Sequence, residues 1–419
     1  MLGTTNSSSP LSLNTSQWAS DSFAISQSLT NPLDSLNSNF GIGSSSSSQP
    51  PQDQLFNQQA VTAPTKTSPN PNPNPYITSA AITPDFNGDG KTDKVWVDST
   101  TGEIIIRLMD GSKVLEQGSL GKFDLTAYTY EIGDFNGDGK TDFLLRNKTT
   151  GANSIVLMDG TKVASMASLT SVDPAWTPEI GDFNGDGKTD IFWHNATTGE
   201  NAIWEMNGTT VLSATVLDKT DPALTPSIVD FDGNGKSDIF WRNPTTGADS
   251  AWFMDGTQKT ELALQSQDAA WTPTFGDFNG DYKTDILWRN TQTGQNQIWL
   301  MNGILVTQGT LDTVDSSWTS QIGDFNGDGK TDIFWHNSKT GENTAWLMDG
   351  TTVATQAFLP TTNTALTPSL GDYNGDGKTD IYWRDQTGGA DTIWTIDGTT
   401  ATPNPISDAD KLTPEWYTF

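Results

Sequence analysis

The chain has 419 residues, with 51 acidic and 22 basic side chains that give a formal net charge of −29. This acidic excess argues against binding to nucleic acids, which requires a basic face, and no apolar run approaches the ~20 residues of a membrane span. Cysteine is absent, which excludes disulfides and thiolate chemistry, and the 39 glycines and 21 prolines favour turn-rich β structure.

Residues 1–76 are predicted to form a disordered segment and linker. They are rich in serine, asparagine and proline, including the run Ser44–Ser48 and the Asn-Pro alternation from Pro69 to Pro75. Such a composition cannot bury enough apolar surface to offset the entropy of the chain. The first residues show no basic region followed by an apolar one, so we expect no standard secretory signal peptide.

Residues 77–419 consist of a unit that repeats every 47 to 49 residues. Each unit contains the string Asp-Phe-Asn-Gly-Asp-Gly-Lys-Thr-Asp or a close variant. The strings begin at Asp85, Asp134, Asp182, Asp230, Asp277, Asp324 and Asp372, within repeats that start near residues 80, 129, 177, 225, 272, 319 and 367. A period of this length is typical of β-propellers.

Each repeat is predicted to form four short strands. In the third repeat they cover residues 178–183, 191–195, 202–206 and 210–217. An Asp-Gly or Asn-Gly pair follows each first aspartate at a constant offset of 25 residues, and such pairs favour two-residue hairpin turns with positive φ at both residues. Recurrent tryptophans are assigned to the core between neighbouring sheets. The sequence therefore predicts an all-β, seven-bladed β-propeller with four strands in each blade.

Within each aspartate string, oxygen-bearing side chains stand at positions 1, 3, 5 and 9, and glycine stands at position 6. A tight loop of this kind wraps one hard cation, and the backbone carbonyl of residue 7 completes the ligand set. Six or seven oxygens, three of them carboxylates, suit Ca²⁺ better than Mg²⁺, which demands a stricter octahedron. We therefore predict up to seven Ca²⁺ ions, one in each blade. The alternative is a set of metal-free Asx turns, in which repulsion among the carboxylates would go unrelieved.

The predicted metal ligands, loop by loop, are Asp85, Asn87, Asp89, Lys91 and Asp93; Asp134, Asn136, Asp138, Lys140 and Asp142; Asp182, Asn184, Asp186, Lys188 and Asp190; Asp230, Asp232, Asn234, Lys236 and Asp238; Asp277, Asn279, Asp281, Lys283 and Asp285; Asp324, Asn326, Asp328, Lys330 and Asp332; and Asp372, Asn374, Asp376, Lys378 and Asp380.

Two loops depart from this pattern. The fourth exchanges its oxygen types, with Asp232 at position 3 and Asn234 at position 5, and keeps three carboxylates. The fifth has Tyr282 in place of the glycine at position 6, which forces a residue with a side chain into a strained turn. We expect the fifth site to be weaker or distorted.

These seven strings resemble the FG-GAP (VCBS-type) repeat family, which includes the calcium-bearing propeller of integrin α-chains. The resemblance covers residues 77–419. It implies calcium in the loop between the first and second strands of each blade, and a recognition or adhesion module located outside the cell or at the cell surface. Integrin propellers carry the motif in only some of their blades, whereas all seven repeats have it here.

A second set of repeated residues has two interpretations. A basic residue lies 12 positions after the first aspartate in six repeats, and an Asn or Asp follows seven residues later. The pairs are Arg146 and Asn153, His194 and Asn201, Arg242 and Asp249, Arg289 and Asn296, His336 and Asn343, and Arg384 and Asp391. They could form a polar and aromatic surface that holds sugars or anions. Alternatively, they brace the hairpin loop and stack on tryptophan, which is the interpretation we favour because perfectly repeated residues usually belong to the scaffold.

Enzyme chemistry finds little support, because no nucleophile stands beside a base in a recognisable motif. We therefore expect a calcium-binding recognition module rather than an enzyme, monomeric and with a protein or glycan ligand on one propeller face. The alternatives are a calcium-dependent propeller lectin and a hydrolase or lyase with its site in the central channel. An unrepeated cluster of charged residues would indicate the enzyme.

The last eight residues, 412–419, match the strand that precedes each loop. Aligning Leu412 with Leu224 places Thr418 where a loop would have its first aspartate. Since Pro84 weakens the corresponding strand of the first repeat, we predict that residues 412–419 close the ring beside the first blade and bury Trp416 and Phe419. The alternative is a frayed stub of a truncated eighth repeat.

Overall fold

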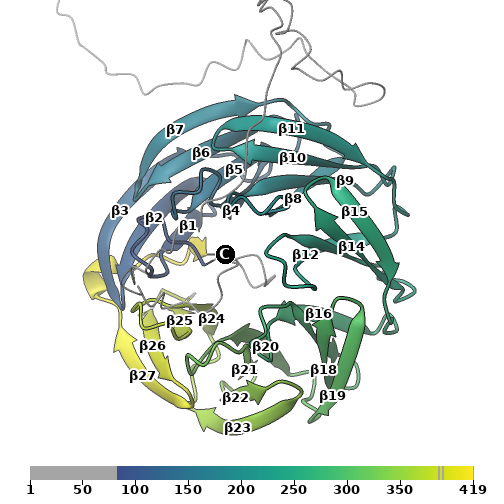
Figure 1. The fold of residues 1–419 in the computed structure, drawn as a ribbon. Helices are drawn as coiled ribbons and strands as arrows, with labels where there is room; N and C mark the ends of the chain where they lie inside the picture. The colour runs from purple at the N-terminus through teal and green to yellow at the C-terminus, as the bar shows by residue number, and fades with distance from the viewer. Residues whose placement is uncertain (1–82, 386, 389–390, 419) are drawn as a thin grey trace, which may run out of the picture.

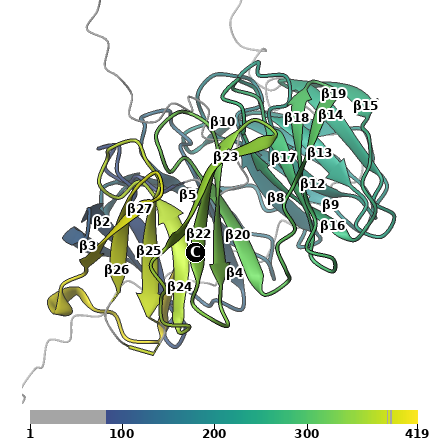
Figure 2. The same cartoon turned by 90° about the horizontal axis from the view of Figure 1, so that it is seen from below.

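A computed structural model describes residues 83–385, 387–388 and 391–418. Seven four-stranded antiparallel sheets are arranged as blades around a central axis (Figure 1). The predicted seven-bladed propeller is therefore confirmed, while the predicted disordered segment, residues 1–76, lies outside the described residues. Seen at 90° to this view, the strands of the sixth and seventh blades run from one face of the ring to the other (Figure 2). Within the described residues, no helix has the length and apolar character needed to cross a membrane.

Each blade has the same strand order from the axis outward. The innermost strands are β28 (Trp416–Thr418), β4 (Tyr128–Gly133), β8 (Trp176–Gly181), β12 (Thr225–Val229), β16 (Trp271–Gly276), β20 (Trp318–Gly323) and β24 (Leu366–Gly371). The second strands are β1 (Lys94–Asp98), β5 (Asp142–Asn147), β9 (Asp190–Asn195), β13 (Asp238–Arg242), β17 (Asp285–Asn290), β21 (Asp332–Asn337) and β25 (Asp380–Asp385). The third strands are β2 (Glu103–Asp110), β6 (Asn153–Asp159), β10 (Asn201–Asn207), β14 (Asp249–Asp255), β18 (Asn296–Asn302), β22 (Asn343–Asp349) and β26 (Thr392–Asp397). The outer strands are β3 (Lys113–Lys122), β7 (Lys162–Leu169), β11 (Thr210–Leu217), β15 (Gln258–Ala263), β19 (Leu305–Leu311), β23 (Thr352–Leu359) and β27 (Thr400–Pro405). A short 3₁₀ turn, η2 (Asp408–Asp410), lies between β27 and β28.

Tryptophan pairs fill the core of the third to seventh blades. In the third blade, Trp193 on β9 is fully buried and meets Trp204 on β10 edge to face, with ring centroids 5.2 Å apart. Every residue of β9 is buried, because this strand packs against neighbouring blades on both faces. The second strand of this repeat, which the sequence predicts over residues 191–195, therefore lies between two neighbouring sheets.

Neighbouring blades are joined by two backbone hydrogen bonds that recur around the ring. Between the first and second blades, Gly160 N–H donates to the carbonyl of Phe86 at 2.8 Å, and Thr141 N–H donates to the carbonyl of Asp85 at 2.8 Å. The acceptors are the first two residues of the preceding aspartate loop. Each loop is therefore held by the hairpin turn and by the loop of the next blade.

The hairpin turns differ from the sequence prediction in one respect. The Asp or Asn of each Asp-Gly or Asn-Gly pair is the last paired residue of its strand, as in Asp159, which faces Lys162 across β6 and β7. Glycine is the first central residue of the turn, with φ of 63° at Gly160. The second central residue is not glycine, and its φ is not positive, because Tyr282 is the one non-glycine residue with positive φ among the described residues. Positive φ at the first central residue alone is the pattern of a type II′ turn, not of the expected type I′. The aspartate side chain consequently lies beside the turn and not at its centre.

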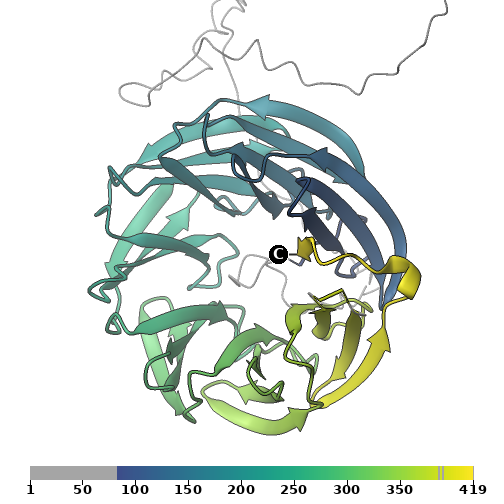
Figure 3. The same ribbon diagram turned by 180° about the vertical axis from the view of Figure 1, so that it is seen from behind.

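The ring closes through the C-terminal strand. β28 pairs with β1 as the innermost strand of the first blade, and Figure 3 shows this yellow strand beside the blue strands of that blade. The sequence alignment of this segment was wrong by four residues. Trp416 faces Asp98 as Trp176 faces Asn195, so Thr418 takes the place of Pro178 and does not replace a loop aspartate. Trp416 is partly buried rather than buried, and Phe419 lies outside the described residues.

The reason for the error is that Leu412-Thr413-Pro414 matches Leu224-Thr225-Pro226 in letters alone. In the folded chain, Trp416 N–H donates to the carbonyl of Thr413, as Trp176 N–H donates to that of Asp173. Thr413-Pro414-Glu415 therefore forms the turn before the strand, and the strand begins at Trp416.

Deleting residues 412–419 should destabilise the propeller strongly, because it exposes the edge of β1 and removes the carbonyls of Thr413 and Trp416 that Arg384 binds. We expect the free energy of unfolding to fall by at least about 3 kcal/mol, the scale of losing a core aromatic side chain, together with self-association. Thermal unfolding and light scattering measure both effects. Glu415→Gln, at the exposed turn, serves as a neutral control. A monomeric truncation of unchanged stability would contradict the closure described above.

Candidate functional site

Six of the aspartate loops join the innermost strand of a blade to its second strand, and the first loop precedes β1, whose inner neighbour is the C-terminal β28. In the third loop, one carboxylate oxygen of Asp182 accepts a hydrogen bond from Gly185 N–H at 2.7 Å, and the other accepts one from Gly187 N–H at 2.8 Å. The side-chain oxygen of Asn184 accepts from Asp186 N–H at 2.8 Å. The chain is thus wound around the first carboxylate, whose Oδ1 also accepts from Asp186 N–H at 3.2 Å. Asp182 Oδ2 and Asn184 Oδ1 each keep a further lone pair for another partner.

The carboxylate at position 9 is the buried end of each loop. Asp190 is 0% exposed and accepts hydrogen bonds from Phe183 N–H at 3.1 Å and Met206 N–H at 2.8 Å. Burial raises the pKa of Asp190 to about 7; the two backbone N–H groups oppose this shift, and the charges of Asp182 and Asp186 add to it. The loop therefore places further negative charge near a carboxyl group whose ionisation is already disfavoured by burial.

This arrangement recurs in all seven loops. Burial raises the pKa of the position-9 aspartate to about 7 in five of them and to about 8 in two. The five are Asp93, Asp142, Asp190, Asp332 and Asp380, and the two are Asp238 and Asp285.

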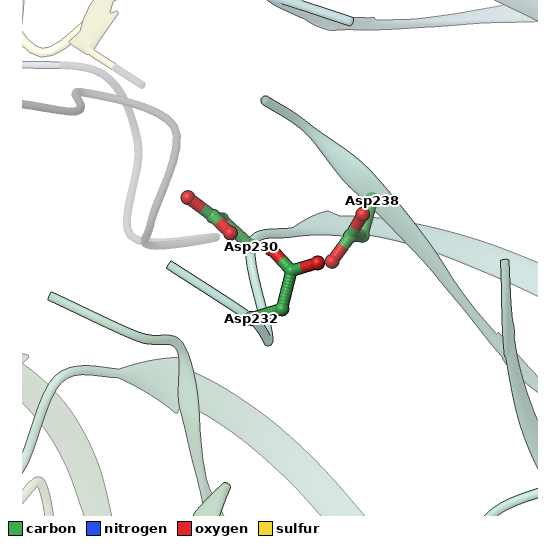
Figure 4. Close-up of side chains that lie close together, drawn as sticks. All are labelled: Asp230, Asp232 and Asp238. Atoms are coloured by element: carbon green, nitrogen blue, oxygen red, sulfur yellow. The ribbon is translucent and has the colours of Figure 1, made fainter. Parts of the chain in front are cut away.

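The fourth loop brings three carboxylates together. Oxygens of Asp230, Asp232 and Asp238 lie within 4.8 Å of one another, the one such group of three acidic or histidine side chains among the described residues (Figure 4). The sequence signal for it is the aspartate at position 3, where the other six loops have asparagine. The neutral amide oxygen of asparagine can act as a cation ligand in the same place as a carboxylate oxygen. The aspartate at position 3 therefore changes the charge there but leaves an oxygen ligand in place.

The fifth loop keeps its geometry despite the missing glycine. Tyr282 has φ of 64°, and its N–H donates to Asp277 at 2.8 Å, as the glycine of the other loops does. An added Cβ would meet no atom within 4 Å at Gly187 or Gly235, the corresponding glycines of the third and fourth loops. The cost at Tyr282 is therefore in the backbone conformation and not in a clash.

The repeated basic residues lie inside the protein and brace the connections between blades. Arg146 donates to the side chain of Asn153 at 2.9 Å and to the carbonyl of Trp176 at 2.7 Å, and its guanidinium lies 4.9 Å from the ring of Trp193 in the next blade. Arg384 makes the same contacts at the ring closure, 5.0 Å from Trp96. The scaffold interpretation of these residues is therefore correct, and they do not form a ligand surface.

An unrepeated polar cluster occupies the interface between the seventh and first blades. Lys94, which stands where the other repeats have Phe or Ile, donates to Ser369 at 2.6 Å and lies 4.7 Å from the ring of Tyr382. The Tyr382 hydroxyl donates to Asp391 at 2.8 Å. The sequence analysis missed this cluster, although the departure of Lys94 from the repeat consensus was visible.

This seam cluster is closed to solvent. Lys94 is 4% exposed and Tyr382 is 1% exposed. Nearby Arg107, which stands where the third to seventh blades have their second core tryptophan, donates to the carbonyl of Asp410 at 2.6 Å. The cluster thus ties β1 and β2 to β25 and to the final turn, which is a structural role.

Two further acidic residues break the repeat near the axis. Glu131 and Glu179 lie on the neighbouring innermost strands β4 and β8, where later blades have Ser, Thr or Gln. Burial raises the pKa of each to about 7, and the charge of Glu179 adds to the shift at Glu131. The sequence signal that could have identified them is this departure from the later repeats.

Comparison with known proteins agrees with the fold. A family model for the FG-GAP-like repeat matches residues 85–145, 134–193, 182–241, 230–288, 277–335 and 324–383, which confirms the resemblance drawn from the seven strings. No curated protein matches the chain. A lectin from Agrocybe aegerita, solved for its recognition of non-reducing terminal N-acetylglucosamine, is similar with a TM-score of 0.64 at 14% identity, over 82% of this chain and 98% of the lectin. A post-proline cleaving enzyme from Rickettsia typhi is similar with a TM-score of 0.53 at 10% identity, over 78% of this chain and 53% of the enzyme. At these identities the likeness shows the fold alone.

Tyr282→Gly should stabilise the protein. A left-handed conformation costs a residue with a side chain about 1–2 kcal/mol, which glycine avoids. The greater conformational entropy of glycine in the unfolded chain offsets about 0.4–1 kcal/mol of this gain. We expect a net gain of up to about 1 kcal/mol in the free energy of unfolding, measured by denaturant titration. Gly187→Tyr is the matched reverse change and should destabilise by a similar amount. A loss of stability in Tyr282→Gly would show that the tyrosine ring makes contacts worth more than the strain.

The buried Lys94 should make a contribution to stability that rises with pH between 7 and 9, opposite in sign to that of the position-9 aspartates, whose raised pKa values make their contribution fall with rising pH. Burial lowers the pKa of Lys94 to about 7, so in this window the unfolded chain binds a proton that the folded protein releases. The slope can reach about 1.4 kcal/mol per pH unit. Among the facing groups, the pKa values of Tyr373 and Tyr382 are raised by burial, so both stay neutral here. The difference in unfolding free energy between the wild type and Lys94→Met should change in favour of the wild type as pH rises across this window, whereas the exposed Lys113→Met should follow the pH dependence of the wild type. A pH-independent difference for Lys94→Met would refute this assignment.

Proposed function

Since the chain belongs to the FG-GAP-like repeat family, we propose that it is a recognition module whose propeller holds up to seven Ca²⁺ ions, one in each aspartate loop. The single observation that carries the calcium proposal is the repeated loop geometry. Seven times, a first carboxylate organises the loop backbone, and a second, buried carboxylate closes it. The residues that would hold each ion are those at positions 1, 3, 5 and 9, with the carbonyl of residue 7.

The donor set fits a hard divalent cation. All side-chain donors are carboxylate or amide oxygens, which Ca²⁺ prefers, and their number suits its flexible coordination. The pKa values of the position-9 aspartates are raised by burial and by their neighbouring carboxylates, so ionised loops carry unfavourable charge at neutral pH. Bound Ca²⁺ would supply the compensating positive charge at each loop, and seven ions would change the net charge from −29 to −29 + 14 = −15.

Cation binding at the loops would act on the whole ring, because the loops also join the blades. The carbonyl of Asp85 accepts from Thr141 N–H of the next blade at 2.8 Å, and Asp85 N–H donates to the Thr141 hydroxyl at 2.8 Å. The same residue is therefore a candidate ligand and an interblade contact. Ordering the loop by a cation would order the interface that it forms.

The recognition role rests on the family and on the shape of the fold. The likeness in fold to the Agrocybe aegerita lectin supports a propeller that acts as a recognition module. The partner class that we propose is a protein or a glycan, met outside the cell or at its surface, and the propeller acts as a monomer. A central-channel hydrolase or lyase is the less favoured alternative: the unrepeated cluster at the seam is buried, and the observation on its side is the pair Glu131 and Glu179 near the axis.

Glycan binding is a second candidate, favoured by that lectin likeness over nearly the full length of the lectin. A glycan array probed with the full chain in calcium and in chelator tests it. Calcium-dependent binding to a defined set of terminal sugars would support a lectin. Binding to no sugar, combined with capture of a specific cell-surface protein, would favour the protein partner.

Removal of calcium should lower the thermal stability of the protein. A ligand present at 100 times its Kd stabilises the folded state by about 2.7 kcal/mol at each site, so chelation should lower the melting temperature by several degrees or more. Calorimetric titration should count up to seven ions. Asp186→Asn should remove or weaken one of them, and Asp218→Asn, in an exposed linker, should remove none. A melting temperature unchanged by chelator would overturn the calcium proposal.

A further inference from the structure

The lysine at position 7 of each loop has two kinds of partner. In five blades its ammonium group binds the aspartate just before the hairpin-turn glycine of the same blade. The pairs are Lys91 and Asp110 at 2.5 Å, Lys140 and Asp159 at 2.5 Å, Lys236 and Asp255, Lys330 and Asp349 at 2.6 Å, and Lys378 and Asp397 at 2.6 Å. In the other two blades the ammonium lies on a carboxylate of the loop itself. Lys188 is 3.2 Å from Asp186, and Lys283 is 3.6 Å from Asp281.

The identity of the turn residue divides the blades in the same way. The turn residue is aspartate in the first, second, fourth, sixth and seventh blades, and asparagine in the third and fifth, as Asn207 and Asn302. Because glycine occupies the first central position of the turn, the side chain of the preceding residue lies beside the loop and is within reach of the lysine. A carboxylate forms a charge-assisted hydrogen bond with the ammonium, whereas a neutral amide offers a weaker acceptor. Where the turn has asparagine, the lysine takes the nearest carboxylate, which is position 5 of its own loop.

The aliphatic stem of this lysine packs close to a glycine of the preceding loop, which limits the positions that its ammonium group can reach. The Cγ atom of Lys188 would lie 3.3 Å from a Cβ added at Gly137 in the preceding loop, and that of Lys330 would lie 3.4 Å from one at Gly280. Across the seven blades the ammonium is therefore found on one of two acceptors. One acceptor is the turn residue and the other is a candidate calcium ligand.

An ammonium group on the position-5 carboxylate competes with a cation for that ligand. It must be displaced before the carboxylate can turn to the ion, and it then repels the ion from nearby. We propose that the turn residue sets the cation affinity of its blade, aspartate by drawing the lysine away from the loop and asparagine by leaving it on the loop. The inference rests on the calcium binding proposed above, and it makes the third and fifth loops the weaker sites.

The size of the effect follows from the exposure of these ion pairs. Exposed pairs are worth up to about 1 kcal/mol, which corresponds to about fivefold in Kd. Tyr282 adds strain to the fifth loop, so the third loop gives the clean comparison. We expect the third loop to bind Ca²⁺ about fivefold more weakly than the sixth, and Asn207→Asp to remove most of that difference. Asp349→Asn in the sixth loop should weaken its own site by a similar factor.

Individual loops can be followed through glycine amides. Gly187 N–H donates to Asp182 at 2.8 Å, and Gly329 N–H donates to Asp324 at 2.9 Å, so each amide resonance reports its own loop. The full chain is labelled with ¹⁵N-glycine, and Ca²⁺ is titrated in a chelator-buffered series. The midpoint for Gly187 should lie about fivefold above that for Gly329 and should move to it in Asn207→Asp. Equal midpoints in the wild-type chain would overturn the inference.

A double-mutant cycle separates the lysine mechanism from a general effect of added negative charge. Lys188→Met keeps the stem over Gly137 and removes the ammonium, so it should tighten the third loop by itself. Asn207→Asp should then have little further effect, because there is no lysine left to draw away. If Asn207→Asp tightens the site equally with and without Lys188, the effect is long-range charge and the proposal is wrong. If no glycine amide responds to Ca²⁺ in any variant, the calcium proposal itself fails, which is a distinct result.

Discussion

The stability of this ring depends on the backbone of its aspartate loops. In every blade, the loop carbonyls accept hydrogen bonds from the turn and from the loop of the next blade, and at the closure Gly111 and Thr92 donate to Tyr373 and Asp372 at 2.7 and 2.6 Å. These bonds fix the register between blades, because neither partner can shift without leaving a buried polar group unpaired. Any ligand that orders the loops is thereby coupled to the contacts between sheets.

Six of the seven interfaces use nearly the same chemistry, and the seventh does not. At the ordinary interfaces, aliphatic and aromatic side chains meet, and at most of them an arginine or histidine lies against the tryptophan of the next blade, as His194 does against Trp241 at 5.2 Å. At the seam, Lys94 and two tyrosines take apolar positions, and the C-terminal strand supplies the missing edge. A ring of near-identical units could close with a different number of blades, and a distinctive final interface is one physical means of favouring a single closure.

The acidic character of the chain is concentrated where the blades meet. Three carboxylates in each loop stand near backbone that must stay ordered, and burial raises the pKa of the innermost one. Lysine at position 7 offsets part of this charge in all seven blades, but one ammonium cannot satisfy three carboxylates. The cation proposed for each loop would supply a further positive charge, and the proposed effect of the lysine is to set how readily each loop accepts it.

The sequence by itself determined the number of blades, the four strands in each and the place of every aspartate loop, because these follow from local patterns repeated seven times. It also pointed to the positive φ that the structure shows at Tyr282, since the loop demands it at position 6. Only the tertiary structure decided the register of β28, the burial of Arg146 and its equivalents, and the role of Lys94. Lys94 and Ser369 are 275 residues apart, and alignment of repeats cannot reveal a contact that exists only once, at the closure of the ring. The same limit applies to the lysines of the loops, whose partner depends on a turn residue that faces them only when β-strands pair in three dimensions.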